Sequence, residues 1–362
     1  MTFTLDAAKE LAIPITFLCT TSACGYLCYF HYQHLIDQGL VPLKNEGCLT
    51  NGYLDTPIPW FPGMKDMHLR DFPTFVRTTD PDDILFNFTK NEARRATQGS
   101  AIIINSFDEL ERPVLDAMRF MLSTPVYSIG PLSLLSRHIP DGPVSSLGSS
   151  LWTEDTTCLG WLDLKDRASV LYVNFGSVTV MSKEELVEFA WGLANSKLDF
   201  LWVVRSDLVR EEPGVVMQEF LEETKERGMV TSWCPQEAVL AHPVVGGFLT
   251  HSGWNSTLES IAGGVPMLSW PFLSEQPTNC KFVCGEWGIG MEIGSSVKRG
   301  EVEMLVKELM VGEKGMEMRK KTMVWKESAR RACDVGGSSM LNLERVINDV
   351  LLPPSTQLGK LC

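Results

Sequence analysis

The sequence predicts an α/β protein with two domains, each built around a doubly wound parallel sheet. Apolar runs rich in β-branched residues alternate with helical stretches over most of the chain, which is typical of parallel strands joined by covering helices. The chain has 362 residues, of which 44% are hydrophobic and 21% are charged, so it is long enough for two cores. A stretch rich in Gly, Pro and Ser at 131–150 predicts a flexible connection between the halves.

These boundaries predict the domain organisation. We expect a first domain over 1–130, a linker over 131–150, a second domain over 151–352 and a tail over 353–362. The carboxyl-terminal helices of the second domain are able to pack back on the first.

The first domain is expected to contain three strands, over 15–19, 101–105 and 126–130. A helix over 22–37 follows the first of them. Asp80 with Pro81 predicts the start of another helix, because an N-cap residue followed by proline is typical of a helix start. Three strands are fewer than the ~5 to 6 of a typical sheet, so we expect this domain to be incomplete.

The uncharged stretch Ala12–Phe30 is interpreted as a buried strand and helix rather than a membrane span. Pro14 and several hydroxyl residues interrupt it. Acidic Asp6 and Glu10 precede it, where a signal peptide would have basic residues. We therefore expect no membrane span and no targeting segment.

The second domain is expected to contain five strands, over 169–177, 200–204, 229–232, 244–250 and 265–270. Ser182 and Glu185 form a predicted capping box that opens a helix through Asn195. Ser256 and Glu259 have the same spacing, and the helix that they begin is expected to stop at the glycine pair 263–264.

Charge and cysteine content exclude several classes of protein. The net charge of -13 makes a nucleic-acid backbone an unlikely partner. The ten cysteines include no C-x-x-C pair and no zinc spacing, so we expect no metal, a reducing cytoplasmic location and buried thiols. We also expect a monomer.

The stretch "THSGWNSTLES", 250–260, places many hydrogen-bonding side chains at one predicted strand end. Ligands of open α/β sheets bind at this edge, where a helix N-terminus offers backbone N–H groups and a positive dipole. His251, Asn255 and Ser256 add side-chain hydrogen bonds suited to a diphosphate, and Gly253 allows close approach of the backbone. Simple helix capping by Ser256 and Glu259 is the competing interpretation.

Neighbouring strand ends favour the ligand site. Three further ends carry polar or aromatic residues, namely Gly176–Ser177, Trp233 with Gln236, and Glu275–Gln276. A dehydrogenase is disfavoured because no G-x-G-x-x-G follows a first strand, and a P-loop hydrolase is disfavoured because no G-x-x-x-x-G-K-[ST] occurs.

The run "WCPQEAVLAHPVVGGFLTHSGWNSTLESIAGGVPMLSWPFLSEQ", 233–276, closely resembles the signature box of plant family 1 UDP-glycosyltransferases. The resemblance extends over nearly the whole chain, including "YVNFGS". It is closest to the subgroup that glucosylates terpenoid, cyanogenic and cytokinin-type alcohols, with iridoid aglycones such as deoxyloganetin as candidates. It implies the glycosyltransferase type B fold, with two Rossmann-like domains and the acceptor on the side of the first.

The resemblance also implies a role for each site residue. Trp233 would stack on uracil, Cys234 and Gln236 would lie at the base and ribose, and Glu259 would hold the ribose hydroxyls. The diphosphate would be held by Ser177, His251, Asn255 and Ser256, with Trp254 packing beside them and toward the sugar. Glu275 and Gln276 would accept hydrogen bonds from the sugar hydroxyls. Ser252 stands where the family usually has cysteine.

The implied reaction is transfer of glucose from UDP-glucose to a hydroxyl of a small hydrophobic acceptor, with inversion and without a metal or other cofactor. His251 and the helix end would neutralise the leaving diphosphate. The family's basic histidine and its orienting aspartate would lie before Met1, because "MTFTLDAAKELAIP" resembles the helix that follows that aspartate. None of His31, His34, His68, His138, His242 and His251 has a recognisable aspartate partner at a strand end. Two hypotheses follow: a glycosyltransferase impaired in this form, and a catalytically silent nucleotide-sugar-binding protein.

Overall fold

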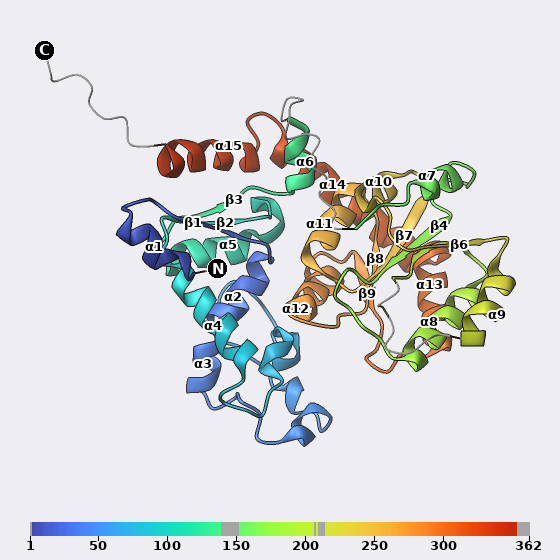
Figure 1. Ribbon diagram of the computed structural model, residues 1–362, viewed down its shortest axis with the longest axis horizontal. Helices are drawn as coiled ribbons and strands as arrows, with labels where there is room; N and C mark the ends of the chain where they lie inside the picture. The colour runs from blue at the N-terminus through green and yellow to red at the C-terminus, as the bar shows by residue number, and fades with distance from the viewer. Residues whose placement is uncertain (1, 139–151, 206–207, 209–213, 353–362) are drawn as a thin grey trace, which may run out of the picture. The chain divides into compact units, whose positions relative to one another are not determined.

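The structure, a computed structural model, describes residues 2–138, 152–205, 208 and 214–352. Its internal contacts divide the chain into two compact units (Figure 1). Unit 1 comprises the described residues up to His138 and those from Ser328 onward, and unit 2 comprises the described residues between them.

This division differs from the expected domains at two places. Residues 328–352 group with unit 1; we assigned them to the second domain while allowing its carboxyl-terminal helices to pack back on the first. Residues 132–138 of the expected linker are helical, as α6 (Leu132–Leu135) and η5 (Ser136–His138), because Leu134 and Leu135 are buried. The rest of the expected linker, from 139 to 150, and the expected tail, 353–362, lie outside the described residues.

Unit 1 contains a parallel sheet whose described strands follow the order β1-β2-β3. The strands are β1 (Thr16–Cys19), β2 (Ala101–Ile104) and β3 (Val126–Ser128). The helices are α1 (Thr4–Glu10), α2 (Ala23–Phe30), α3 (Tyr32–Asp37), α4 (Ile84–Ala96), α5 (Asp108–Met121), α6 and α15 (Ser338–Arg345). Short helical turns are η1 (Glu46–Leu49), η2 (Tyr53–Asp55), η3 (Leu69–Asp71), η4 (Thr74–Val76), η5 and η7 (Val346–Leu351).

Two expected helices of unit 1 have different limits. The helix expected over 22–37 is divided at His31 into α2 and α3, and Ser22 caps α2 by accepting a hydrogen bond from the Gly25 N–H at 3.0 Å. The helix expected to start at Asp80 begins after Asp83, which accepts from the Phe86 N–H at 2.8 Å. Asp80 instead accepts from the Asp82 N–H within a turn. The prediction of Asp80 as the N-cap is therefore wrong, and Asp83 has that role.

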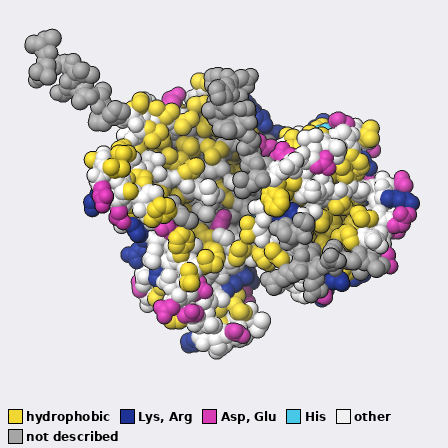
Figure 2. Space-filling model, in the orientation of Figure 1, with side chains coloured by type: hydrophobic (Ala, Val, Ile, Leu, Met, Phe, Trp, Pro, Cys, Tyr) yellow, Lys and Arg dark blue, Asp and Glu magenta, His cyan; other side chains and the backbone are white. Residues whose placement is uncertain are grey.

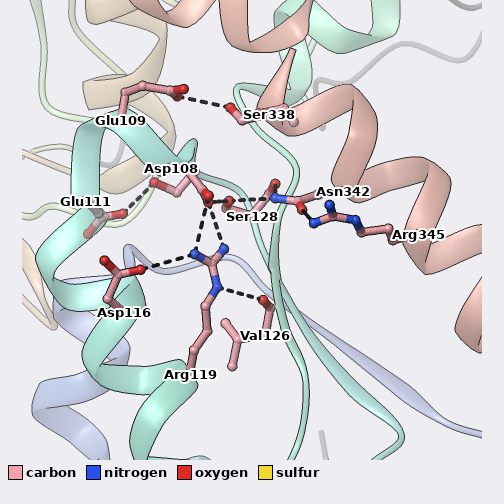
Figure 3. A network of polar contacts seen from close by, with 12 residues as sticks. Asp108, Glu109, Glu111, Asp116, Arg119, Val126, Ser128, Ser338, Asn342 and Arg345 are labelled. Atoms are coloured by element: carbon pink, nitrogen blue, oxygen red, sulfur yellow. Dashed lines mark hydrogen bonds and ion pairs between the residues drawn. The ribbon is translucent and has the colours of Figure 1, made fainter. Parts of the chain in front are cut away.

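Polar contacts attach α15 to the sheet of unit 1 (Figure 3). The Asn342 side-chain amide donates to the Ser128 carbonyl at 2.9 Å, and the Ser339 hydroxyl donates to the Gly130 carbonyl at 2.6 Å. Because Ser128 and Gly130 lie at the end of β3, these bonds explain why residues 328–352 belong with unit 1.

Unit 2 contains a parallel sheet whose described strands follow the order β6-β5-β4-β7-β8-β9. The strands are β4 (Val170–Asn174), β5 (Asp199–Val203), β6 (Gly228–Thr231), β7 (Val245–Thr250), β8 (Met267–Ser269) and β9 (Gly290–Glu292). The chain order reverses between β4 and β7, which defines the switch point where ligands of doubly wound sheets bind. β9 was not predicted, because its three residues, Gly290, Met291 and Glu292, include only one apolar side chain.

Helices cover both faces of this sheet (Figure 1). On one side lie α8 (Lys183–Ser196), α9 (Gly214–Thr224) and α13 (Arg299–Val311); on the other lie α10 (Gln236–Ala241), α11 (Trp254–Gly263) and α12 (Gln276–Lys281). The remaining elements are α7 (Thr157–Leu162), η6 (Phe282–Glu286) and α14 (Glu313–Cys333), the last of which spans the division between the units. The predicted capping box of Ser182 and Glu185 is present at α8.

The core of unit 2 lies between the sheet and the α8 layer. Its largest buried side chains are aromatic: Phe175, Phe189, Phe200, Trp202, Phe220 and Trp270. Burying each such side chain contributes ~1.5 to 3 kcal/mol, so this core stabilises the strands whose ends carry the site.

The surface carries mixed charge. In Figure 2, Lys and Arg side chains are interspersed with Asp and Glu on the face in view, without one large basic patch. None of the described helices combines the length and apolarity that crossing a membrane requires.

Candidate functional site

The loops after β4 and β7 meet at the switch point of unit 2. Gly176, in the loop after β4, has a φ of 72°, and a Cβ there would come 2.5 Å from the Nε2 atom of His251. Gly253, after β7, touches the same imidazole from its own loop. The ring of His251 therefore lies between two glycines, and any side chain at either position would displace it.

α11 begins earlier than the sequence predicted. Its N-cap is Gly253, and no side chain in the described residues caps it, so the expected capping box of Ser256 and Glu259 is wrong. Both side chains instead accept hydrogen bonds from the Gln236 amide nitrogen, Ser256 Oγ at 2.9 Å and Glu259 Oε2 at 2.6 Å. The capping interpretation competed with that of a ligand site and does not hold here, while a ligand-binding role of Ser256 and Glu259 stays a prediction. The helix ends as expected, with Gly264 at a φ of 76°.

Gln236 connects α11 to β4. Its side-chain oxygen accepts from Asn174 Nδ2 at 2.8 Å and from the Tyr172 hydroxyl at 3.1 Å. Together with its bonds to Ser256 and Glu259, these contacts join strand β4 to helix α11. Tyr172 and Asn174 were not among the predicted site residues. Their position within "YVNFGS", just before Ser177, was the signal that pointed to them.

Glu259 is a partly buried carboxyl group with altered acidity. Its pKa is raised to about 7, chiefly by burial and to a smaller extent by the nearby Glu237 carboxylate, while the hydrogen bond from Gln236 opposes both. The carboxyl therefore titrates near neutral pH in the ligand-free protein. Carboxyl groups whose pKa is shifted this far by burial occur often at functional sites.

His251 is uncharged at neutral pH. Its pKa is lowered to about 4, chiefly by burial and to a smaller extent by the positive charge of Arg205. Its Nδ1 atom is buried and has no hydrogen-bond partner in the described part of the chain. We expected His251 to help neutralise a diphosphate; in this state it offers a hydrogen bond and no positive charge.

The remaining predicted site residues differ in exposure. Trp233 is partly exposed, with its ring centroid 6.3 Å from that of Trp152. Cys234 is buried, and its thiol lies 3.4 Å from the Tyr172 hydroxyl, with a pKa raised to about 12 by burial. Ser177 is exposed in the loop after β4, and Asn255 is exposed in the first turn of α11. Aromatic, amide and hydroxyl groups are thus brought to one edge.

Trp254 lies in the interior, whereas we expected it to pack toward a sugar. Its side chain is 2% exposed and its ring centroid lies 6.1 Å from that of Trp287. The indole therefore supports the start of α11 from beneath.

Glu275 and Gln276 lie at the start of α12, and each has partners within the protein. Glu275 is buried and accepts from the Ser274 hydroxyl at 2.6 Å. The Gln276 side-chain oxygen accepts from the backbone N–H groups of Phe272 and Leu273, both at 2.8 Å. We expected Gln276 to accept from sugar hydroxyls, but its oxygen is occupied, so its amide nitrogen is the group left to contact a ligand.

Two histidines have aspartate partners that the sequence did not reveal. His242 Nε2 lies 3.1 Å from Asp163, and His68 Nδ1 lies 3.6 Å from Asp71. His242 directly follows α10 and precedes β7, so it lies at the amino edge of the sheet, opposite the site. His68 belongs to unit 1, at the N-cap of η3. His31 packs on Phe61, and burial lowers its pKa, while His34 packs on Trp60.

The described residues contain no cluster of three or more His, Cys, Asp or Glu side chains that could hold a metal ion. The chemistry that the site offers is hydrogen bonding to a polar anion, a stacking surface at Trp233 and a carboxylate at Glu259.

The chain is similar to known proteins over nearly its whole length. Residues 163–324 match the family model described as UDP-glucoronosyl and UDP-glucosyl transferase. The chain is 57% identical over 352 residues to a 7-deoxyloganetin glucosyltransferase of Gardenia jasminoides, covering 97% of this chain and 73% of that protein. It is 55% identical over 354 residues to an (R)-mandelonitrile beta-glucosyltransferase of Prunus dulcis, covering 97% and 73%.

A solved structure extends the likeness to the fold. UGT2 of Phytolacca americana, complexed with UDP-2fluoro-glucose and pterostilbene, superposes with a TM-score of 0.80 at 32% identity, covering 96% of this chain and 74% of that one. The structure of a UDP-glucose: anthocyanidin 3-O-glucosyltransferase in complex with UDP gives a TM-score of 0.80 at 26% identity, covering 96% and 72%.

Proposed function

Because this chain belongs to the UDP-glucoronosyl and UDP-glucosyl transferase family and has the glycosyltransferase type B fold, we propose that it transfers glucose from UDP-glucose to a hydroxyl of a small hydrophobic acceptor. The donor-binding part of this proposal rests on one observation: at the switch point of unit 2, near His251, Gln236 donates hydrogen bonds to Ser256 and Glu259. Family membership carries the reaction class.

The donor is proposed to lie along the edge of the sheet, from Trp233 to α12. Uracil stacks on Trp233, the ribose hydroxyls bind Glu259, and the diphosphate meets the loops of Ser177 and His251. The support for this order is chemical: a carboxylate accepts from two vicinal hydroxyls, whereas an anion prefers the N-terminus of α11, whose dipole contributes up to ~2 kcal/mol. Glucose then extends toward Gln276.

The acceptor is proposed to be an alcohol of the iridoid or cyanohydrin kind. This follows from the names of the two relatives, which act on 7-deoxyloganetin and (R)-mandelonitrile. Attack of the acceptor hydroxyl on the anomeric carbon breaks the bond to UDP and inverts the configuration, while a general base takes the hydroxyl proton. We assign this base to no histidine of the chain. We further propose a cytoplasmic monomer, supported by nine free cysteines in the described residues.

The test is binding followed by transfer. Calorimetry is expected to show that UDP and UDP-glucose bind while ADP-glucose does not, and NMR of the product is expected to show a β-glucoside. Absence of UDP binding would contradict the proposed donor site. Formation of an α-glucoside would contradict the proposed inversion at the anomeric carbon.

A catalytically silent nucleotide-sugar-binding protein is the second candidate. It is favoured by the positions of the histidines in the described residues, of which His251 alone lies at the carboxyl edge of a sheet strand. UDP-glucose binding without transfer to any of a panel of hydrophobic alcohols would support it, with the Gardenia relative as the positive control.

A further inference from the structure

An ordered series of hydrogen bonds runs from the loop after β4 to Glu259. The Gly176 backbone N–H donates to Asn174 Oδ1 at 2.9 Å, Asn174 Nδ2 donates to Gln236 Oε1 at 2.8 Å, and Gln236 Nε2 donates to Glu259 Oε2 at 2.6 Å. We call these four residues the amide relay.

The direction of the amide relay is set at its first member. A backbone N–H can only donate, so the Asn174 atom that faces Gly176 must be its oxygen, and the other end of that amide must be its nitrogen. The same logic then applies to Gln236, whose oxygen meets Asn174 and whose nitrogen meets Glu259. The Tyr172 hydroxyl supports this direction, since it accepts from Asn174 at 2.9 Å and donates to Gln236 at 3.1 Å.

Asn174 is the member that no ligand is expected to touch. It is 4% exposed and ends β4, and its amide bonds Gly176 on one side and Gln236 on the other. A carboxylate at this position would accept from the Gly176 N–H equally well. Its second oxygen would require the Gln236 amide to flip, so that the Gln236 carbonyl rather than its N–H faced Glu259.

We propose that Asn174 is a positioning residue that fixes the orientation of Gln236 and so keeps a hydrogen-bond donor on the Glu259 carboxylate. This deepens the proposed function, on which its consequence for the donor sugar nucleotide rests. Through the amide relay, the loop proposed to meet the diphosphate and the carboxylate proposed to hold the ribose share one set of hydrogen bonds.

Other groups around Glu259 act on its charge independently of Asn174. Glu237 on α10 is a like charge that disfavours the ionised carboxyl, and Tyr172 on β4 is neutral because burial raises its pKa well above its ordinary value. At the far end of α11, Lys326 of α14 donates to the Gly263 carbonyl at 2.9 Å. The Glu237 and Lys326 contacts do not involve Asn174. Tyr172 loses the hydrogen bond from Asn174 when Asn174 is replaced, but it stays neutral, so a change in the titration of Glu259 reports on the amide relay.

The test is to titrate Glu259 in the ligand-free protein and to monitor the titration by carbon-13 NMR, with glutamate labelled at the carboxyl carbon. Loss of one resonance in Glu259→Gln assigns the signal. Asn174→Asp, which reverses the orientation, is expected to raise the midpoint by on the order of one pH unit. Asn174→Ala, which removes the orientation without adding charge, is expected to raise it by a smaller amount. UDP-glucose affinity at pH 7 is then expected to fall about fivefold in Asn174→Asp.

Asn342→Asp is the matched control, because Asn342 is a buried amide of unit 1 that is 5% exposed. It is expected to cost stability while leaving the Glu259 midpoint unchanged. If the Glu259 midpoint rises in Asn174→Asp but not in Asn174→Ala, the effect is due to the new charge and the proposal is overturned. An unchanged midpoint in both variants would also overturn it. If the wild-type chain binds no UDP-glucose, the proposed function fails, yet the titration still decides the role of Asn174.

Discussion

The imidazole of His251 lies directly against Gly176, so that a Cβ at Gly176 would come 2.5 Å from Nε2. This contact brings together the two loops of the switch point and makes glycine a requirement of the site, since Gly176 also has a φ of 72°.

Gly176→Ala is therefore expected to weaken UDP-glucose binding by about tenfold or more, because the new methyl group displaces the imidazole and strains the loop. Calorimetry measures the affinity, and thermal unfolding measures the accompanying loss of stability. Gly160→Ala in α7 is the control, because its added Cβ meets no atom within 4 Å. Equal affinity of Gly176→Ala and Gly160→Ala would show that the His251 position does not matter for the donor.

Glu259→Ala is expected to weaken UDP binding by about ten- to hundredfold, because two ribose hydroxyls lose a charged acceptor and such bonds contribute ~1.5 to 3 kcal/mol. Glu237→Ala removes a neighbouring, exposed carboxylate on α10 and is expected to leave the affinity within about twofold. Isothermal titration of UDP into both variants makes the comparison. A loss of the same size in the two variants would point to general electrostatics instead of a ribose contact.

The affinity for UDP-glucose is expected to depend on pH near neutrality. The pKa of Glu259 is raised to about 7, so the ionised form that accepts ribose hydroxyls predominates above that pH and is lost as the pH falls through it. Affinity should therefore be constant above about pH 8 and fall by up to about tenfold per unit below pH 6.

UDP-glucose is the right probe for this measurement, because its diphosphate is a diester and does not titrate in the range. His251 does not interfere, since its pKa is lowered to about 4. Glu259→Gln is expected to bind with an affinity independent of pH between 6 and 8. Persistence of the wild-type profile in that variant would assign the titration to another group.

Gln276→Glu tests the choice of sugar. The side-chain oxygen of Gln276 accepts from the Phe272 and Leu273 N–H groups, so a carboxylate keeps these bonds but loses the donor that we propose contacts glucose. We expect wild type to prefer UDP-glucose over UDP-galactose by about tenfold or more in competition experiments, and the variant to lose most of this preference. A wild-type preference for UDP-galactose would reject the assignment.

The alternation of apolar runs and helical stretches was enough to predict parallel sheets, because burial on both faces imposes a pattern that residues show locally. The strands at 101–105 and 244–250 were correctly located for this reason. The motif of 233–276 likewise identified the family, since its polar residues follow strand ends in a fixed order.

The sequence could not decide which partners those residues have. Ser256 and Glu259 have the spacing of a capping box, yet α11 starts at Trp254 and both side chains bond Gln236 from another helix. Asp80 and Asp83 compete as N-caps, and the geometry of the turn selects the second. Spacing along the chain shows which groups are able to form local hydrogen bonds. Which partner a group actually bonds depends on distances that the tertiary structure sets.

By itself, then, the sequence determined the fold class, the family and the edge of the second sheet at which a sugar nucleotide is proposed to bind, because hydrophobic pattern and motif order are local properties. Only the tertiary structure decided that Trp254 is buried, that the Gln276 oxygen is occupied, and that Asn174 orients Gln236 toward Glu259. It also decided the charge states, because the pKa values of His251 and Glu259 depend on burial among residues that are distant in sequence.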